Sequence, residues 1–499
     1  MARIAVIGAG MGAMAAAARL AVAGHRVTVY ERSAAPGGSV GSFEREGFVF
    51  DTGPGLLHLP AVWRDLFVKT GREPLERCVG LVQVDPAGRH LFADGTEAVL
   101  PDASRAGIVS ALESALGAGA GERWGDFLGR ARDAWDRSRR PLLEEPLWRD
   151  WRVLERDPYP ALRQRRLLRT RQAATVAETG AWELADRRLA ALLEGCVLGY
   201  GLDPRHAPAG AALLPYLEQT FGTWYVEGGL HRLARAVHGR CLARKVEFRF
   251  ECEVTSVVVR DGRAAGVVLA DGSAVEADQV VAGAGAAALT GCPLWGEDDI
   301  RPREGGGKEP LPGRFTVLLA LRGGRPAAVA HRSVVHAPDT GEEAAAVFGG
   351  RLAERPTVTV LRPDDPATRP DGGHEAVTVS ATVAGHGGPV DWTDKALRER
   401  YAEVLVEAAA RAMGESGGGL RERMLWREIL TPAETGGMAA PSLAGPGGRH
   451  LHPANSTRLP GLHLVGGYAH PGGGLAHAGM SGALVAGLIV EGPDFRGSQ

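Results

Sequence analysis

The chain opens with apolar runs separated by glycine-rich breaks. Residues 4–7 are apolar and predict a short buried strand, and residues 8–12, with three glycines, predict a tight loop. Residues 13–23 are small or apolar and predict a helix that ends at Gly24. Residues 26–30 alternate, as a second strand would, before Glu31. The pattern therefore favours a strand–loop–helix–strand unit over a signal peptide or a membrane helix, in which clustered glycines and Arg19 would be costly.

Further along the chain, the hydrophobic pattern changes from helical to strand-like and back. Residues 103–198 carry amphipathic runs rich in Arg and Glu, which are typical of helices. The remaining expected elements are strands at 314–321, 356–361, 376–384 and 461–467, a helix over 396–413 that ends near the glycines 417–419, a flexible linker or lid over 436–450, and a helix over 481–492.

The first glycine loop has the chemistry of a dinucleotide-binding turn. Gly8 permits the tight turn, Gly10 lets the backbone approach a pyrophosphate, and Ala13 keeps the helix close to the sheet. The N–H groups and positive dipole end of the helix then face the phosphates. Glu31 stands about 20 residues further on, where a carboxylate binds the ribose hydroxyls.

The residues after Glu31 favour FAD over a nicotinamide cofactor. Two more glycine-rich turns follow at 34–42 and 47–60, which suits a larger ligand that lies across the sheet edge. A second fingerprint, Gly283-x-Gly285-x-x-Ala288, also follows a strand and could bind NAD(P)H. No strand that ends in an acid follows it, which argues against direct reduction by NAD(P)H.

Several motifs together resemble a known family. These are Glu31, Arg32, Pro36, Gly37 and Gly38; Asp51, Gly53 and Pro54; and the stretches 199–236, 252–285 and 453–492. They are similar to the phytoene desaturase-like (carotenoid desaturase) branch of the FAD-dependent amine oxidase superfamily. The resemblance implies an α/β fold with a discontinuous Rossmann-like FAD-binding domain of the glutathione reductase type and a mixed-sheet and helical substrate domain. The expected FAD domain comprises 1–75, 225–292 and 455–499, and the substrate domain 76–224 and 293–454, with its helical part at 103–198 and strands within 314–384.

The motifs and the resemblance together predict the residues around FAD. The expected set is Gly8, Gly10, Gly12, Ala13, Glu31, Arg32, Gly37, Gly38, Ser39, Gly53, Pro54, Val254, Gly466, Gly467, Gly474 and Met480. The main-chain N–H near Met480 is expected beside the carbonyl edge of the flavin ring, and Ser39 stands where the family commonly has Arg. The glycine turns near both ends of the chain should therefore meet in space around one cofactor.

The residues that carry the chemistry are harder to predict, because a hydrocarbon substrate offers nothing to ionise. Such a site needs an apolar tunnel more than an acid–base pair. The candidates are His58, Tyr225, His470 and His477, with Trp224 as a further aromatic residue on the same side; each could equally serve packing or loop structure.

The first functional hypothesis is desaturation of an extended isoprenoid or polyene by hydride transfer to FAD, with oxygen or a quinone as acceptor. A flavin amine oxidase, a porphyrinogen-type oxidase and a flavin-dependent isomerase on the same fold are the alternatives. The formal charge of −2 argues against nucleic-acid binding. The five scattered cysteines lack metal-ligand spacing, so no metal site and a cytoplasmic location are expected.

Association with the inner face of the membrane stays open at the sequence level. Residues 123–171 carry many arginines and the tryptophans Trp124, Trp135, Trp148 and Trp151. They could form helices at the lipid headgroups, but acids at salt-bridge spacing favour a solvated helical face. The expected partner is a hydrophobic small molecule, and the oligomeric state is not predicted.

Overall fold

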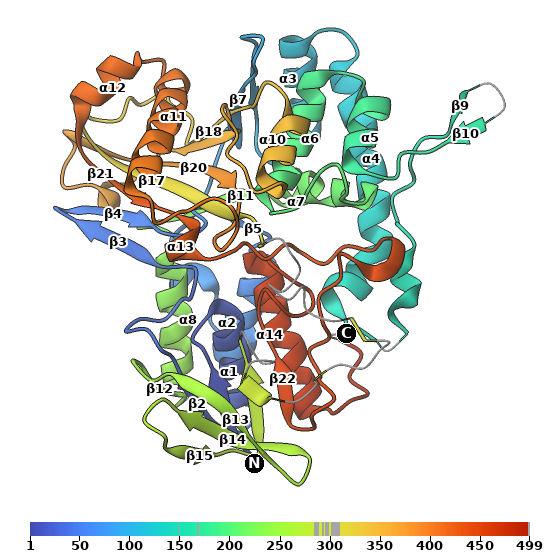
Figure 1. Cartoon of the computed structure of the whole chain (residues 1–499), viewed down its shortest axis with the longest axis vertical. Helices are drawn as coiled ribbons and strands as arrows, with labels where there is room; N and C mark the ends of the chain where they lie inside the picture. The colour runs from blue at the N-terminus through green and yellow to red at the C-terminus, as the bar shows by residue number, and fades with distance from the viewer. Residues whose placement is uncertain are drawn as a thin grey trace.

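The computed structural model describes residues 1–148, 150–166, 169–283, 289–291, 294, 299–300 and 310–497, with only the backbone described at 164–166 and 169–170. The lower lobe in Figure 1 is built on a parallel five-stranded sheet. Its strands, in spatial order, are β12 (Glu247–Arg249), β2 (Arg26–Tyr30), β1 (Arg3–Ile7), β16 (Gln279–Ala282) and β22 (Leu462–Leu464). Three widely separated parts of the chain thus supply one sheet, which is the discontinuous arrangement that the motifs predict.

Helices cover this parallel sheet, and a small antiparallel sheet stands beside it. Buried side chains of α1 (Met11–Val22), α14 (Leu475–Val490), α8 (His231–Ala243) and α2 (Ala61–Gly71) form one core with the strands. The antiparallel strands are β13 (Val254–Arg260), β14 (Arg263–Leu269) and β15 (Ala274–Glu276).

The upper lobe contains a larger mixed sheet of seven strands (Figure 1). In spatial order these are β21 (Met424–Leu430), β17 (Gly313–Arg322), β20 (His374–Val383), β19 (Val358–Leu361), β18 (Arg332–Val335), β7 (Gly88–Leu91) and β8 (Glu97–Leu100). Helix α11 (Lys395–Met413) packs on one face through its apolar stripe. The hairpin of β3 (Ser42–Arg45) and β4 (Phe48–Asp51) reaches the opposite face, where Phe48 and Phe50 contact Leu318.

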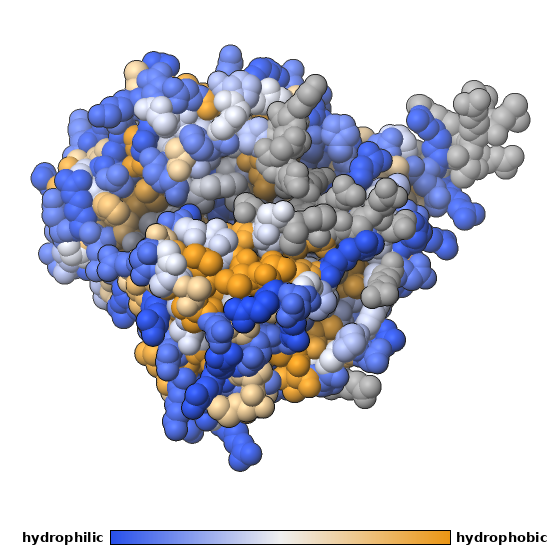
Figure 2. All heavy atoms as spheres, turned by 60° about the horizontal axis from the view of Figure 1, so that its bottom comes forward, coloured by the Kyte–Doolittle hydropathy of each residue, from blue (hydrophilic) through white to orange (hydrophobic). Residues whose placement is uncertain are grey.

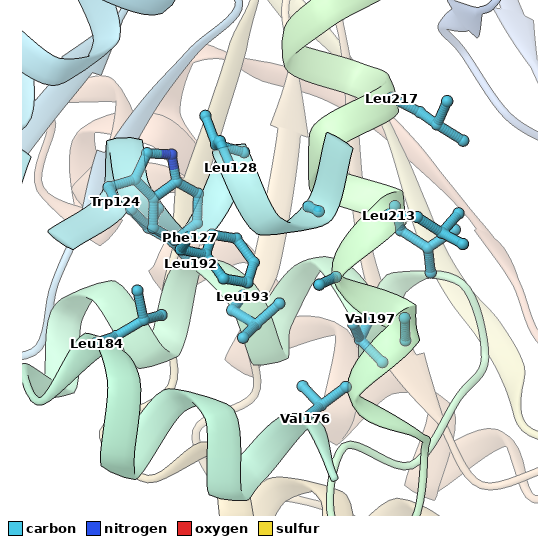
Figure 3. Close-up of a cluster of buried hydrophobic side chains, with 14 of the residues drawn as sticks. Trp124, Phe127, Leu128, Val176, Leu184, Leu192, Leu193, Val197, Leu213 and Leu217 are labelled. Carbon is cyan, nitrogen blue, oxygen red and sulfur yellow. The ribbon is translucent and has the colours of Figure 1, made fainter. Parts of the chain in front are cut away.

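A bundle of helices lies next to this sheet. It consists of α3 (Arg105–Leu116), α4 (Ala120–Arg139), α5 (Val176–Thr179), α6 (Arg187–Gly199), α7 (Leu213–Phe221) and the short α10 (Thr340–Phe348). Figure 3 shows the buried core of this bundle, with Trp124 and Phe127 of α4 beside leucines of α6 and α7. Trp124 and Trp135 are 0% and 8% exposed, so neither ring can lie among lipid headgroups.

The helix expected over 396–413 is confirmed as α11, which ends at Met413 just before the glycines 417–419. These glycines begin a further helix, α12 (Gly417–Arg423), which the Ser416 hydroxyl caps by accepting a bond from the Gly419 N–H. Two local predictions need correction. A hairpin of β9 (Gln164–Arg166) and β10 (Arg169–Arg171) interrupts the region expected to be helical. Residues 436–450 are not a free linker, since 441–445 are buried and Ser442 N–H donates to Pro471 O.

Candidate functional site

The first glycine turn lies between β1 and α1 and leaves the start of the helix open. Gly8 has a positive φ of 91° and donates its N–H to Tyr30 O at 2.8 Å. Gly10 is the N-cap of α1, no side chain caps it, and a Cβ there would project into open space. The first N–H groups of α1 therefore face a free space of the kind that a diphosphate fills.

Glu31 is held at the mouth of this turn. Its Oε2 accepts the Ala9 N–H at 2.6 Å, and its Oε1 accepts the N–H and the hydroxyl of Ser33, each at 2.8 Å. The residue is 9% exposed. A carboxylate fixed in this way suits the hydroxyls of a ribose, and that contact stays a prediction.

The second and third glycine turns pack directly against the first. Gly37 N–H donates to Ala9 O at 2.9 Å, and a Cβ on Gly38 would lie 3.1 Å from Gly10 Cα. A Cβ on Gly53 would lie only 1.9 Å from Ser39 O, so any side chain at Gly53 would clash with that carbonyl. Ser39 itself is exposed beside this contact.

The turns from the two ends of the chain meet. A Cβ on Gly12 would lie 2.8 Å from Ala478 O and 2.9 Å from Gly466 Cα, and one on Gly482 would lie 2.5 Å from Gly12 O. Small residues thus let α1 and α14 touch backbone to backbone. The Ser481 hydroxyl accepts the Gly466 N–H at 3.0 Å, which ties the C-terminal turn to its helix.

The free N–H groups of α14 lie one turn before Met480, and the place of the flavin ring beside this turn stays a prediction. Met480 lies in the second turn of α14, so its N–H belongs to the i→i−4 ladder of the helix. Gly474 is the N-cap, with a φ of 99° and no side chain capping it, and Ala478 N–H already donates to Gly474 O. The open donors are therefore those of residues 474–477.

The other predicted cofactor residues occupy varied settings. Val254 begins β13 at 8% exposure and packs in the same core as Tyr30. Arg32 is exposed, Pro54 is half-buried, and Gly467 lies against Ala439. Their individual contacts with the cofactor stay predictions.

Only part of the second glycine motif, which could bind NAD(P)H, lies within the described residues. Gly283 N–H donates to Ile7 O at 2.9 Å, and a Cβ on Gly283 would lie 2.8 Å from the same oxygen. This glycine therefore serves close packing of β16 against β1. Gly285 and Ala288 lie outside the described residues.

Of the predicted catalytic candidates, His58 has the most polar surroundings. It ends β5 (Leu57–His58), and its Nε2 lies 3.7 Å from Oε1 of Glu218. Its Nδ1 is buried and has no hydrogen-bond partner. Burial lowers the pKa of His58, so the ring is neutral near pH 7.

The aromatic candidates of β11 (Thr223–Val226) already make hydrogen bonds. Tyr225 is 7% exposed and donates its hydroxyl to Asp365 Oδ2 at 2.9 Å. Burial raises the pKa of this phenol. The Trp224 indole N–H donates to Phe221 O at 3.1 Å, and the Arg64 guanidinium lies over its ring.

His470 and His477 are both buried beside the C-terminal turn. The Nε2 of His470 lies 3.0 Å from Glu145 O and ties this turn to the end of the helical bundle. Burial lowers the pKa of His470 to about 3 and that of His477 to about 4, so both are neutral near pH 7. Whether any of the four candidates acts on substrate stays a prediction.

A small cavity of about 40 Å³ joins the 53–55 turn to the seven-stranded sheet. Gly53, Gly55 and Tyr225 line one side, and Leu361 and Thr378 of the sheet line the other. Across the described residues, no group of His, Cys, Asp and Glu is arranged to hold a metal ion.

The sequence analysis missed the charged residues that face His58. Glu218 of α7 accepts a bond from Arg332 Nη1 of β18 at 3.1 Å and one from the Tyr200 hydroxyl at 3.2 Å. The lone acid in the apolar run 213–221 was the one available clue to Glu218. Nothing local to the sequence pairs it with Arg332.

The whole chain matches known proteins. Residues 14–490 match the family described as flavin containing amine oxidoreductase. A hydroxyneurosporene desaturase from Cereibacter sphaeroides is 30% identical over 98% of this chain and 97% of its own length. A 4,4'-diapolycopene oxygenase from a Methylomonas species is 29% identical over 98% of both chains. A neurosporene-forming phytoene desaturase from Rhodobacter capsulatus is 30% identical over 99% of this chain and 95% of its own.

Solved structures share the fold at lower identity. An oxidoreductase from Methanosarcina mazei superposes with a TM-score of 0.64 at 18% identity, over 97% of this chain and 99% of that chain. A putrescine oxidase bound to putrescine gives 0.63 at 12% identity, over 98% and 99%. The open helix start at Gly10, the fixed Glu31 and the contact of Gly12 with Gly466 fit the nucleotide that such proteins bind. The chain therefore belongs to the flavin-containing amine oxidoreductase family and is an FAD-dependent oxidoreductase.

Proposed function

We propose that this enzyme desaturates an extended isoprenoid polyene. In this reaction one carbon loses a hydride, its neighbour loses a proton, and a C–C bond becomes C=C. The full-length match to relatives named for desaturation of neurosporene and phytoene derivatives carries the proposal. Bound FAD supplies the hydride acceptor, while the protein supplies position and polarity.

The arrangement of the helical bundle supports an apolar substrate. Leu59, Val62 and Ala476 are buried in the same cluster as the side chains of α4, α6 and α7, and Met480 packs against it. These four residues come from the segments that flank the predicted ring site. An apolar wall therefore stands beside both the 53–60 segment and the start of α14.

Anaerobic reduction of the bound flavin tests the proposal. We expect the yellow absorbance of the purified holoenzyme to bleach on addition of phytoene or neurosporene in detergent, with a new double bond in the recovered polyene. Bleaching by putrescine or a porphyrinogen, and not by a polyene, would instead support an oxidase of the corresponding substrate. Altered double-bond geometry without bleaching would support an isomerase.

Reoxidation identifies the electron acceptor, for which oxygen or a quinone is our proposal. The reduced enzyme is mixed with aerated buffer or with a quinone under argon, and the return of the yellow absorbance is timed. A quinone that restores the colour faster than oxygen is the physiological class of acceptor. Failure of both acceptors would contradict this part of the proposal.

Because extended polyenes dissolve in lipid, we also propose that the enzyme contacts a membrane surface to collect its substrate. Figure 2 shows apolar side chains gathered in the middle of one face of the molecule, within a mostly hydrophilic surface, which supports this. Within the described residues, no helix has the length and apolar character to cross a bilayer. Co-sedimentation with phosphatidylglycerol vesicles is the expected result, and protein that stays in the supernatant would contradict it.

A further inference from the structure

The face of the seven-stranded sheet opposite α11 carries both apolar and polar side chains. Leu318, Ala320 and Ala376 pack against the β3–β4 hairpin, and polar side chains follow beyond them. Thr378, which pairs with Leu318, lines the cavity next to Gly53 and Gly55. Strand pairing places Ser380 between Thr316 and Thr359, and Arg332 level with Leu361, on this same face. Thr359, Thr378 and Ser380 are half-buried, and their hydroxyls make no hydrogen bond to any described residue. They are therefore free to bind something that enters this space.

Charged groups stand beside the polar part of this face, because Arg332 lies level with Leu361 and donates to Glu218 of α7. The side chains of His58, Glu218 and Arg332 keep 22%, 15% and 20% of their surface accessible. Burial is nevertheless the largest influence on the pKa of each of them. These half-buried charged groups lie where α7 meets the sheet, and each keeps part of its surface within reach of a ligand.

The charges in this space do not cancel. Burial opposes ionisation of Glu218, but the neighbouring His58 and Arg332 lower its pKa to about 2, so it is a carboxylate. Arg332 is its partner at 3.1 Å. Arg314 of β17 is a second guanidinium nearby, and burial together with the charge of Arg332 lowers its pKa.

The Arg314 guanidinium has N–H donors that make no hydrogen bond to a described residue. Its single hydrogen bond to a described residue runs from Nη2 to Gly199 O at 3.3 Å, at the end of α6. A guanidinium carries five N–H donors in a planar fork. Because Arg314 is half-buried, its unused donors are partly shielded from water and still within reach of a ligand.

We propose that this space binds a substrate oxygen that accepts hydrogen bonds, an aldehyde or a carboxylate at the end of the polyene, with Arg314 as its main donor. The inference rests on the proposed function and narrows its substrate class to oxygenated polyenes. A hydrocarbon end would leave the Arg314 donors and the sheet hydroxyls unpaired. A carbonyl or carboxylate oxygen pairs with them and offsets the surplus positive charge.

Binding of matched probes to the holoenzyme tests this. Crocetin, a linear polyene with a carboxylate at each end, its dialdehyde, and a linear hydrocarbon polyene of equal length are titrated while the flavin absorbance is followed. We expect crocetin to bind at least about tenfold more tightly than the hydrocarbon. Equal binding of the dialdehyde shows that a carbonyl suffices, and weaker binding shows that charge contributes; both support the proposal.

Arg314→Met should remove that preference, because crocetin loses its main donor and the hydrocarbon no longer leaves that donor unpaired. Arg322→Met, at the exposed end of the same strand, is the matched control and should keep the preference. If Arg314→Met does not fold, the pair Ser380→Asp and Ser380→Lys reports instead, and we expect the first to weaken and the second to strengthen crocetin binding.

Equal wild-type affinity for crocetin and hydrocarbon would overturn the inference, as would equal losses in both arginine variants. Failure of any polyene to bleach the flavin would contradict the proposed function instead. The two failures are therefore distinguishable.

Discussion

The two faces of the seven-stranded sheet differ in what they pack against. On one face Phe315, Val317 and Leu319 of β17 are 0% exposed and share a core with α11. On the other face, Phe48 and Phe50 pack against Leu318, but Thr359, Thr378 and Ser380 are half-buried, and Thr378 lines the cavity beside the 53–55 turn. The first face is apolar and packed, and the second also carries hydroxyls without a partner among the described residues.

This difference shows how alternation along a strand can mislead. A strand such as 376–383, with Val and Ala alternating with Thr and Ser, is typical of a sheet with one face in solvent. Here helices α6 and α7 cover the polar face, and Thr382 bonds Leu198 O of α6. The polar residues therefore mark an interior site and not an outer surface.

Two neighbouring residues give the largest expected contrast between the faces. Val379→Asp places a carboxylate among the buried apolar side chains of the α11 core. The cost should exceed the total stability of about 5–15 kcal/mol or consume most of it, so we expect no folded, soluble protein. Ser380→Asp should fold and bind FAD, as measured by circular dichroism and flavin content. Equal loss of folding in both variants would show that the second face is also tightly packed.

Shortening a side chain on the apolar face should lower the free energy of unfolding by less than Val379→Asp does. Phe315 packs with its ring against Trp392 and Tyr401, at centroid distances of 5.6 Å and 5.2 Å. Phe315→Ala should lower the free energy of unfolding by about 3–5 kcal/mol, because it leaves a cavity. Denaturant titration measures the loss. A change below about 1 kcal/mol would contradict tight packing there.

Lowering the pH should reduce the free energy of unfolding through His336, which follows β18 and stacks on His90. Burial lowers the pKa of His336 from 6.5 to about 3. Between pH 6.5 and pH 3 this side chain is therefore protonated in the unfolded chain and neutral in the folded chain. Stability should therefore fall as the pH falls from 6.5 toward 3, by a contribution of roughly 2–4 kcal/mol.

His336→Gln should make the free energy of unfolding less dependent on pH in this range. His206→Gln is the control, because that side chain is 74% exposed. Unchanged pH dependence in His336→Gln would contradict the assignment.

The smallest effect is expected from Thr378→Val. Because the Thr378 hydroxyl has no partner among the described residues, its loss should change the free energy of unfolding by less than about 0.5 kcal/mol. Binding of the hydrocarbon probe should improve about two- to fivefold relative to crocetin, as measured by flavin titration. A large loss of stability would mean that the hydroxyl is structurally engaged.

The nucleotide-binding part was predictable because its chemistry is contiguous in sequence. Gly8, Gly10 and Glu31 lie within one strand–loop–helix–strand unit, and their roles follow from local geometry. The contact of Gly12 with Gly466 is non-local and was expected only through the family resemblance. The expected role of Met480 stays a prediction, and the pattern did not reveal that α14 begins at Leu475.

The substrate side was predicted less well. Strands β7 and β18 are short, and their pairing joins segments far apart in the sequence. The pair Glu218–Arg332 depends on that pairing and on the position of α7. His58 was singled out, but its neighbours were not, because no spacing rule connects a helix to a strand that follows it after a long interval.

The contact of α1 with α14 has a consequence for biosynthesis. Gly12 meets Gly466 and Ala478, so the pocket that begins at β1 is completed by residues that are synthesised much later. An emerging chain cannot hold its flavin until α14 has left the ribosome. Ribosome-bound chains that lack α14 should therefore be colourless.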